Sequence, residues 1–94
     1  MYEIDFSKVA KKNFKTINKS DIQFLYDSMY DFAQNFSDEY EIALMTTGKI
    51  KKLQGQKEEL YRLKLRTYRV IYKKEENKLI MLVLHVTTRE GAYK

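Results

Sequence analysis

The chain contains no cysteine, no proline and no tryptophan, and it has a single histidine. Without cysteine no disulfide framework or thiolate metal site can form, so a reducing cytoplasmic compartment is the expected setting. One imidazole is too few for a zinc centre, and we expect neither a metal nor another cofactor. The longest apolar run, Leu79 to Leu84, is too short to cross a bilayer, so no membrane association is expected.

What the chain does contain is typical of one small folded domain. Hydrophobic residues make up 44% of its 94 residues and aromatic residues 14%, which favours a globular protein over a disordered one. No proline-rich linker or internal repeat interrupts it, so we expect a single domain over residues 1–94.

Charge is distributed unevenly along the chain. Residues 1–48 hold 5 Lys and Arg against 8 Asp and Glu, whereas residues 49–94 hold 13 against 5. A half with a net charge of +8 favours a polyanionic partner, although a solvated basic surface gives the same composition. The positions of the cations in the fold decide between a polyanion-binding surface and a solvated one.

Residues 60–72, LYRLKLRTYRVIY, sort their side chains by type when folded as a hairpin at Arg66 and Thr67. Side chains alternate along a strand, so one face collects the apolar residues Tyr61, Leu63, Leu65, Tyr68, Val70 and Tyr72. The other face carries Arg62, Lys64, Arg69 and Ile71, with Lys64 opposite Arg69. Like charges in this register repel each other unless an anion lies between them, and a phosphodiester is the obvious candidate.

The first half predicts a short strand and two or three helices. Tyr2 to Phe6 alternates as a strand does, and Ser7 is placed to cap a helix with Ala10, Phe14 and Ile17 on its apolar face. The other face of that helix carries a lysine stripe, which either binds RNA or is simply solvated: Lys8, Lys11, Lys12 and Lys15.

A second helix is predicted from Ser20 and Gln23, which fit a capping box. Its helical period is carried by Ile22, Leu25, Met29, Phe32, Ala33 and Phe36. Ser37 is a candidate cap for a third, short helix that runs through Met45 and ends at Gly48. A basic connector with one short extended piece follows, and its lysines are further candidates for RNA or ribosome binding: Lys49, Lys51 and Lys52.

Residues 79–86, LIMLVLHV, predict a central strand that is covered on both faces. For His85, near its end, a histidine satisfied by local hydrogen bonds is favoured over a catalytic one. Arg89 and Tyr93 follow, four residues apart, so one helical turn would place them on the same side.

The order YRLKLRTYRVIY, apolar strand, VTTREGAYK resembles the RelE/ParE superfamily of type II toxins. That family combines a strand of tyrosine and basic residues, a YRxxY strand and a terminal strand leading to Arg and Tyr. The resemblance covers residues 53–94 and departs at Arg66, where many relatives have glycine. It implies an α+β, RelE-like fold, with an N-terminal strand and two or three helices packed on one face of an antiparallel sheet.

The resemblance also implies an activity. Carried over position by position, the nuclease residues of the RelE branch match Arg62, Lys64, Arg69, Arg89 and Tyr93. They imply a metal-independent, ribosome-dependent endonuclease that cleaves mRNA in the ribosomal A site by attack of the 2'-hydroxyl. Fixed cations would stabilise the negative charge of the transition state, Lys64 is the candidate base, and Tyr93 would stack on a base or orient the hydroxyl. Arg62 stands where RelE has lysine, and arginine does not release its proton at working pH.

Two alternatives stay open at this point. A ParE-like gyrase poison would use the same cations for structure or DNA binding, and a non-enzymatic RNA-binding module would need stacking and phosphate contacts alone. The complete set of five residues favours the nuclease. The resemblance further implies a RelB-like antitoxin as partner, besides the ribosome and mRNA.

Overall fold

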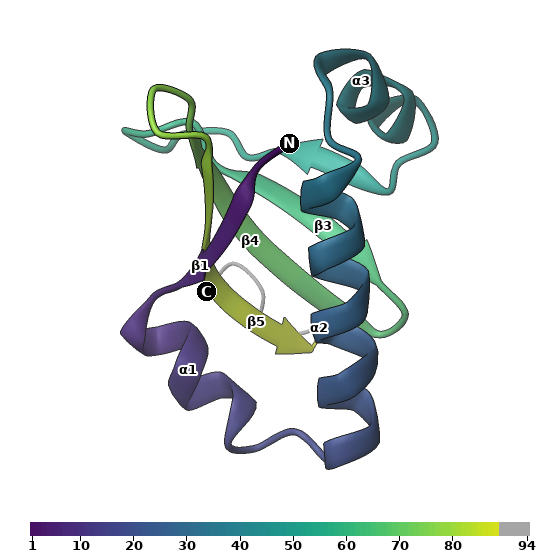
Figure 1. Ribbon diagram of the computed structural model, residues 1–94, viewed down its shortest axis with the longest axis vertical. Helices are drawn as coiled ribbons and strands as arrows, with labels where there is room; N and C mark the ends of the chain where they lie inside the picture. Colours follow the sequence, from purple (N-terminus) through teal and green to yellow (C-terminus); the bar gives the residue numbers. More distant parts are fainter. Residues whose placement is uncertain (89–94) are drawn as a thin grey trace.

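The computed structural model describes residues 1–88. Within these residues three helices and five strands follow one another (Figure 1). Their bounds, in chain order, are β1 Glu3–Phe6, α1 Lys8–Phe14, α2 Lys19–Gln34, α3 Asp38–Thr46, β2 Ile50–Lys52, β3 Tyr61–Leu65, β4 Tyr68–Glu75 and β5 Ile80–Thr88. The expected α+β class is confirmed.

The five strands form one sheet in the order β1-β5-β4-β3-β2. The pairs β5–β4, β4–β3 and β3–β2 are antiparallel, whereas β1 runs parallel to β5, with Glu3 opposite Ile80. The expected antiparallel sheet is confirmed for β2 to β5, and β1 adds a parallel strand at its edge. The strand pattern of residues 2–6 fixes which side chains face the core but not the direction of the neighbouring strand.

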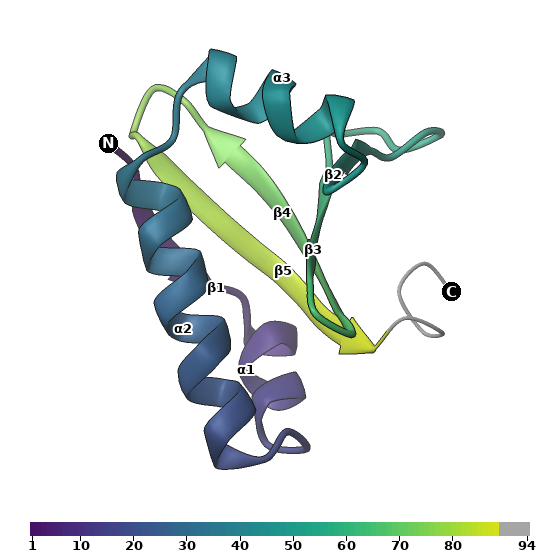
Figure 2. The same ribbon diagram turned by 90° about the vertical axis from the view of Figure 1, so that its right-hand side faces the viewer.

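The helices lie on one face of the sheet (Figure 2), as predicted. α2 turns Leu25, Met29 and Phe32 onto the sheet, where they join Leu63 and Val70 in one buried cluster. Leu25 and Val70 are at most 1% exposed, so this interface has the close packing of a protein core.

Each helix begins at a polar cap. The hydroxyl of Ser7 accepts a hydrogen bond from the Ala10 amide at 3.0 Å, and Ser37 caps α3 through the Tyr40 amide at 3.1 Å, both as predicted. The predicted cap of α2 is wrong. Asn18, not Ser20, accepts from the amide of Asp21 at 2.9 Å, because asparagine caps at least as well as serine and lies two residues earlier.

The predicted coverage of the last strand is also wrong. β5 is an interior strand, but only Met81, Val83 and Val86 are buried beneath the helices. Leu82 and Leu84 point to the opposite face, where they are half-buried. Within residues 1–88 the helices cover the other face of the sheet and leave this outer face without a helix (Figure 2).

A buried ionic cluster joins α3 to β4. Glu41 of α3 accepts hydrogen bonds from the Tyr72 hydroxyl and from the Lys74 ammonium, both at 2.7 Å. Burial, aided by the hydrogen bond to Glu41, raises the pKa of Tyr72 well above its ordinary value. Burial acts to lower the pKa of Lys74, but the hydrogen bond to Glu41 and its negative charge raise it overall. The cluster fixes α3 against the sheet, and the sequence analysis missed it.

Candidate nucleic-acid interface

The β3–β4 hairpin has the register that its side-chain pattern predicted. Lys64 lies opposite Arg69, and Leu63 lies opposite Val70. The inner residues Leu63, Val70 and Tyr72 are at most 2% exposed, whereas the side chain of Lys64 is exposed on the outer face. The hairpin thus buries its apolar face under α2 and presents its cations on the open side of the sheet.

The hairpin turn has an arginine, Arg66, at the position where many turns have glycine. Arg66 adopts a positive φ of 55°, a conformation that usually favours glycine or asparagine. Its guanidinium carbon lies 3.6 Å from the centre of the Phe24 ring on α2, within cation–π distance. This contact offsets part of the backbone cost and ties the hairpin tip to α2.

The cross-strand cations Lys64 and Arg69 lie apart from the ion pairs of the fold. Within residues 1–88 the ion pairs use other lysines, namely Lys52, Lys73 and Lys74. Arg69 is half-buried, and among residues 1–88 its side chain donates a long hydrogen bond of 3.3 Å to the carbonyl oxygen of Tyr68. Within the described part of the chain these two adjacent cations have no carboxylate partner, so their mutual repulsion is not offset by an ion pair.

Arg62, a predicted catalytic residue, has a partner within the fold. Its Nη2 donates to the carbonyl oxygen of Gly48 at 2.6 Å, which ties β3 to the turn after α3. The carbonyl at the end of a helix is a good acceptor for a cation. Arg62 still lies on the outer face, opposite Ile71, but this hydrogen bond takes up part of its guanidinium.

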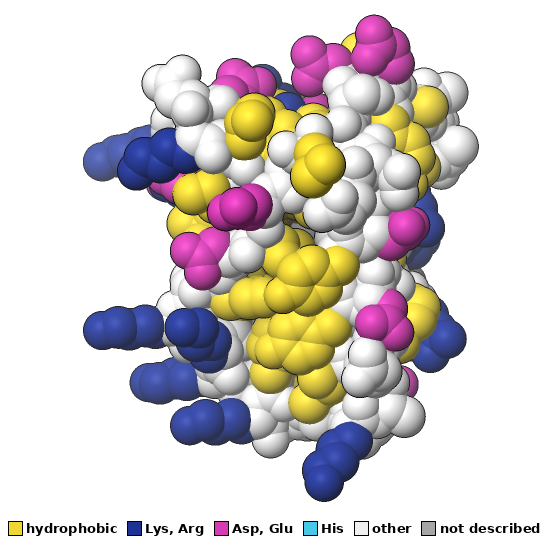
Figure 3. All heavy atoms as spheres, in the orientation of Figure 1, with side chains coloured by type: hydrophobic (Ala, Val, Ile, Leu, Met, Phe, Trp, Pro, Cys, Tyr) yellow, Lys and Arg dark blue, Asp and Glu magenta, His cyan; other side chains and the backbone are white. Residues whose placement is uncertain are grey.

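The candidate RNA-binding lysines divide into separate surfaces. Those of α1 and of its C-cap, Lys15, are all exposed, namely Lys8, Lys11, Lys12 and Lys15. They belong to the helix side of the molecule, where basic side chains project beside an apolar patch (Figure 3). Lys51 lies opposite Arg62 in the β2–β3 pair, and Lys52 is paired with Glu59 at 3.1 Å. The structure therefore brings Lys51, and not the α1 stripe, near the hairpin cations.

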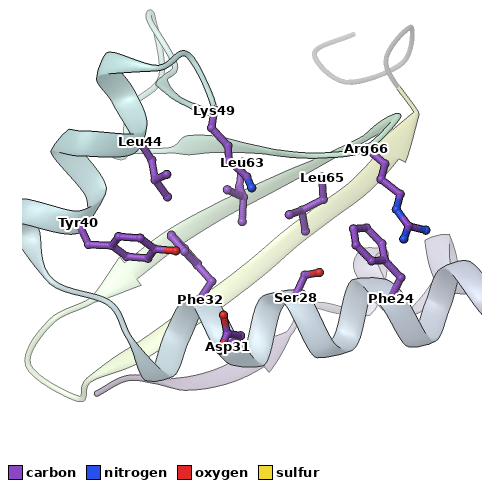
Figure 4. A pocket seen from close by; sticks show the side chains of 10 residues that line it. All are labelled: Phe24, Ser28, Asp31, Phe32, Tyr40, Leu44, Lys49, Leu63, Leu65 and Arg66. Carbon is purple, nitrogen blue, oxygen red and sulfur yellow. The ribbon is translucent and has the colours of Figure 1, made fainter.

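A groove that the sequence analysis missed opens between α2, α3 and β3 (Figure 4). It encloses about 330 Å³ and is walled by Phe24, Phe32, Tyr40 and Leu44, with Asp31, Lys49 and Arg66 supplying charge. Lys49 thus contributes to this groove on the helix side. Its walls come from three separate elements, so no local pattern in the sequence could have indicated it.

Arg89 and Tyr93, the two predicted catalytic residues of the tail, lie outside the described residues. Among residues 1–88 no three histidine, cysteine, aspartate or glutamate side chains lie close enough together to hold a metal ion. The same residues include no helix with the length and apolar character that spanning a membrane requires.

Known protein structures place this architecture in a defined class. No family model and no curated protein sequence matches the chain. RelE toxin structures do match it. The toxin of the intact E. coli RelBE toxin–antitoxin complex superposes with a TM-score of 0.69 at 23% identity, over 96% of this chain and 99% of that one. The archaeal RelE–RelB complex from Pyrococcus horikoshii gives a TM-score of 0.68 at 24% identity, over 97% and 98% of the two chains.

A third similar structure is the metal-bound toxin from Helicobacter pylori, with a TM-score of 0.72 at 15% identity over 99% of this chain and all of that one. The fold of this protein is therefore the RelE-like fold, as the sequence resemblance implied. Similarity at these identities establishes the fold, whereas activity has to be argued from the site.

Proposed function

We infer that this protein is the toxin of a type II toxin–antitoxin system and that it acts as a ribosome-dependent mRNA endonuclease in the cytoplasm. The observation that carries the proposal is the pair of Lys64 and Arg69, which lie directly opposite each other on the open face of a RelE-like sheet. A folded protein gains nothing from this repulsion, but a bound phosphodiester would be held by both cations.

The proposed chemistry is attack of a ribose 2'-hydroxyl on the adjacent phosphate, without a metal. Negative charge develops on the phosphate oxygens in the transition state, and cations already held in place stabilise it more than they stabilise the ground state. Lys64 and Arg69 fit this role, and Arg62 and Arg89 add charge. Tyr93 would contact the RNA by stacking. The ribosome would align the mRNA in its A site.

A RelB-like antitoxin is the proposed protein partner. RelB chains accompany the toxins in the E. coli and P. horikoshii complexes. On this chain, apolar side chains are left exposed on the helix side, among them Tyr30 at 50% and Ile42 at 61%. A partner segment with apolar and acidic residues would cover this surface or the basic outer face.

Primer extension on mRNA translated in the presence of the purified protein tests the proposal. Discrete cuts at codons in the ribosomal A site are expected. A folded protein that leaves mRNA intact during translation contradicts it. Inhibition of DNA gyrase, with mRNA left intact, would instead establish the ParE-like alternative, and RNA binding without cuts would establish the binding module.

A further inference from the structure

His85 is the only histidine of the chain, and the structure places it beside the cations of the outer face. It lies directly opposite Ile71 on β4, while Arg69 lies opposite Thr87. Paired residues share a face, so His85 and Arg69 occupy diagonal positions on the open side of the sheet. Such positions lie about 7 to 8 Å apart, a separation that aromatic and long side chains can span, so both residues can contact adjacent groups of one bound nucleotide.

The imidazole is accessible. His85 is exposed, whereas its opposite neighbour Ile71 is 3% exposed. The local hydrogen bonding that the sequence favoured for this histidine would leave a less open side chain. An exposed imidazole at this place can meet a bound ligand.

The charged groups around this position are mostly cationic. On the outer face β4 contributes Arg69, Lys73 and, at its far end, Glu75, and β3 contributes Arg62 and Lys64. β1, on the other side of β5, contributes Asp5 opposite Leu82 and Glu3 opposite Ile80, so these acids lie toward the far end of β5 from Arg69. Lys73 is paired with Glu58 at 2.6 Å. From the helix side, α1 approaches the backbone of β5 through the neutral side chains of Ser7 and Asn13. An RNA phosphate is thus drawn to the Lys64–Arg69 end, next to the imidazole.

We propose that His85 accepts the proton of the ribose 2'-hydroxyl, an inference that rests on the endonuclease function proposed above. The 2'-oxygen forms a bond to phosphorus, the bond from phosphorus to the 5'-oxygen breaks, and the departing 5'-oxygen takes a proton from water. The 2'-hydroxyl proton moves to the imidazole, which then releases it to solvent. The products are a 2',3'-cyclic phosphate and a free 5'-hydroxyl.

Histidine is chosen over the neighbouring cations for a chemical reason. Arginine holds its proton at all working pH values, and histidine is the side-chain type that ordinarily exchanges a proton between pH 5 and 8. From the sequence, Lys64 was the candidate base. In the proposed site His85 accepts the 2'-hydroxyl proton, and Lys64 holds the phosphate.

The test is single-turnover cleavage of ribosome-bound mRNA by His85→Ala, with and without added imidazole. The variant should fold normally, because the side chain is exposed, and should cleave about 100-fold or more slowly, the usual contribution of a positioned base. Added imidazole should raise the cleavage rate of His85→Ala at least about tenfold. The pH profile of the rescued reaction should then follow the pKa of free imidazole. Lys64→Ala should be slow as well but insensitive to imidazole, and Lys78→Ala, in the β4–β5 turn, should behave as wild type.

Each result separates this inference from the proposed function. If the wild-type protein cleaves and His85→Ala cleaves equally fast, His85 is not the base, and the proposed endonuclease function is unaffected. A slow His85→Ala variant that imidazole does not rescue, with an unchanged pH profile, also overturns it, because the residue then acts only on structure. If folded wild-type protein does not cleave at all, both proposals fail.

Discussion

Lys74 and Arg69 belong to the same strand, β4, and project from opposite faces of the sheet into very different surroundings. The side chain of Lys74 is 10% exposed and is held by Glu41 at 2.7 Å, with the Tyr61 ring 4.7 Å away. Arg69 lies next to another cation, Lys64, on the open face. The inner cation contributes to holding α3 in place, while the outer one meets repulsion that a ligand would relieve. Location on the sheet therefore separates a cation that is paired inside the fold from one that is left for the proposed ligand.

The largest expected effect falls on the inner side. Glu41→Ala should lower the free energy of unfolding by about 3 to 5 kcal/mol, because it leaves the Lys74 ammonium buried without its partner and the Tyr72 hydroxyl without an acceptor. Urea unfolding measures the loss. Glu59→Ala, which breaks the exposed pair with Lys52, is the matched control and should leave the midpoint unchanged. Equal urea midpoints for Glu41→Ala and wild type would show that the cluster does not stabilise the fold.

The apolar face of the hairpin comes next. Leu63 is 2% exposed, so Leu63→Ala should cost about 2 to 5 kcal/mol through the cavity it leaves under α2. Lys64→Ala, one residue further on and on the other face, should change stability little. If thermal unfolding shows a larger loss of stability for Lys64→Ala than for Leu63→Ala, the inner and outer faces of the hairpin have been assigned the wrong way round.

Alkaline pH should weaken the inner cluster. The pKa of Tyr72 is raised in the folded protein by burial and by Glu41, so the stability linked to it is complete below the unfolded value of about 10. Above that pH the unfolded chain loses the proton first, and stability should fall by about 1.4 kcal/mol per pH unit for this one group. Urea midpoints between pH 8 and 11 measure the slope, and Tyr72→Phe should make it shallower. A slope unaffected by Tyr72→Phe would assign the loss to other groups.

A smaller effect is expected at the hairpin tip. Arg66→Ala keeps the positive φ and loses the contact with Phe24, so it should cost about 0.5 to 1 kcal/mol. Arg66→Gly loses the same contact but relaxes the backbone, and its stability should lie above that of the alanine variant. Thermal unfolding of the two variants side by side compares them. A glycine variant less stable than the alanine variant would show that the turn is not strained.

Local pattern was enough to predict much of this fold. Alternation in residues 60–72 gave the hairpin register and both of its faces, because a one-residue slip would have buried Lys64. The periodic apolar residues of α2 predicted its core face. The order of the elements also followed from these local patterns, and the resemblance added the RelE-like class.

What the sequence could not predict depends on contacts between distant segments. Arg62 was placed among the catalytic cations, yet its hydrogen bond to Gly48 forms only because the turn after α3 lands next to β3. Glu41 lies in an acidic first turn that is typical of a solvated helix start, and its burial follows from where Lys74 and Tyr72 lie. The parallel pairing of β1 and the open outer face of β5 also arise from the assembly of the whole sheet.

The central claim is that the outer cations serve a ligand and not the fold, and one double variant tests it most directly. Lys64→Gln combined with Arg69→Gln should leave the urea midpoint unchanged or raise it, since a like-charge repulsion is removed. The same protein should cleave ribosome-bound mRNA at least about 100-fold more slowly than wild type. A well-folded double variant that cleaves at the wild-type rate would contradict the account.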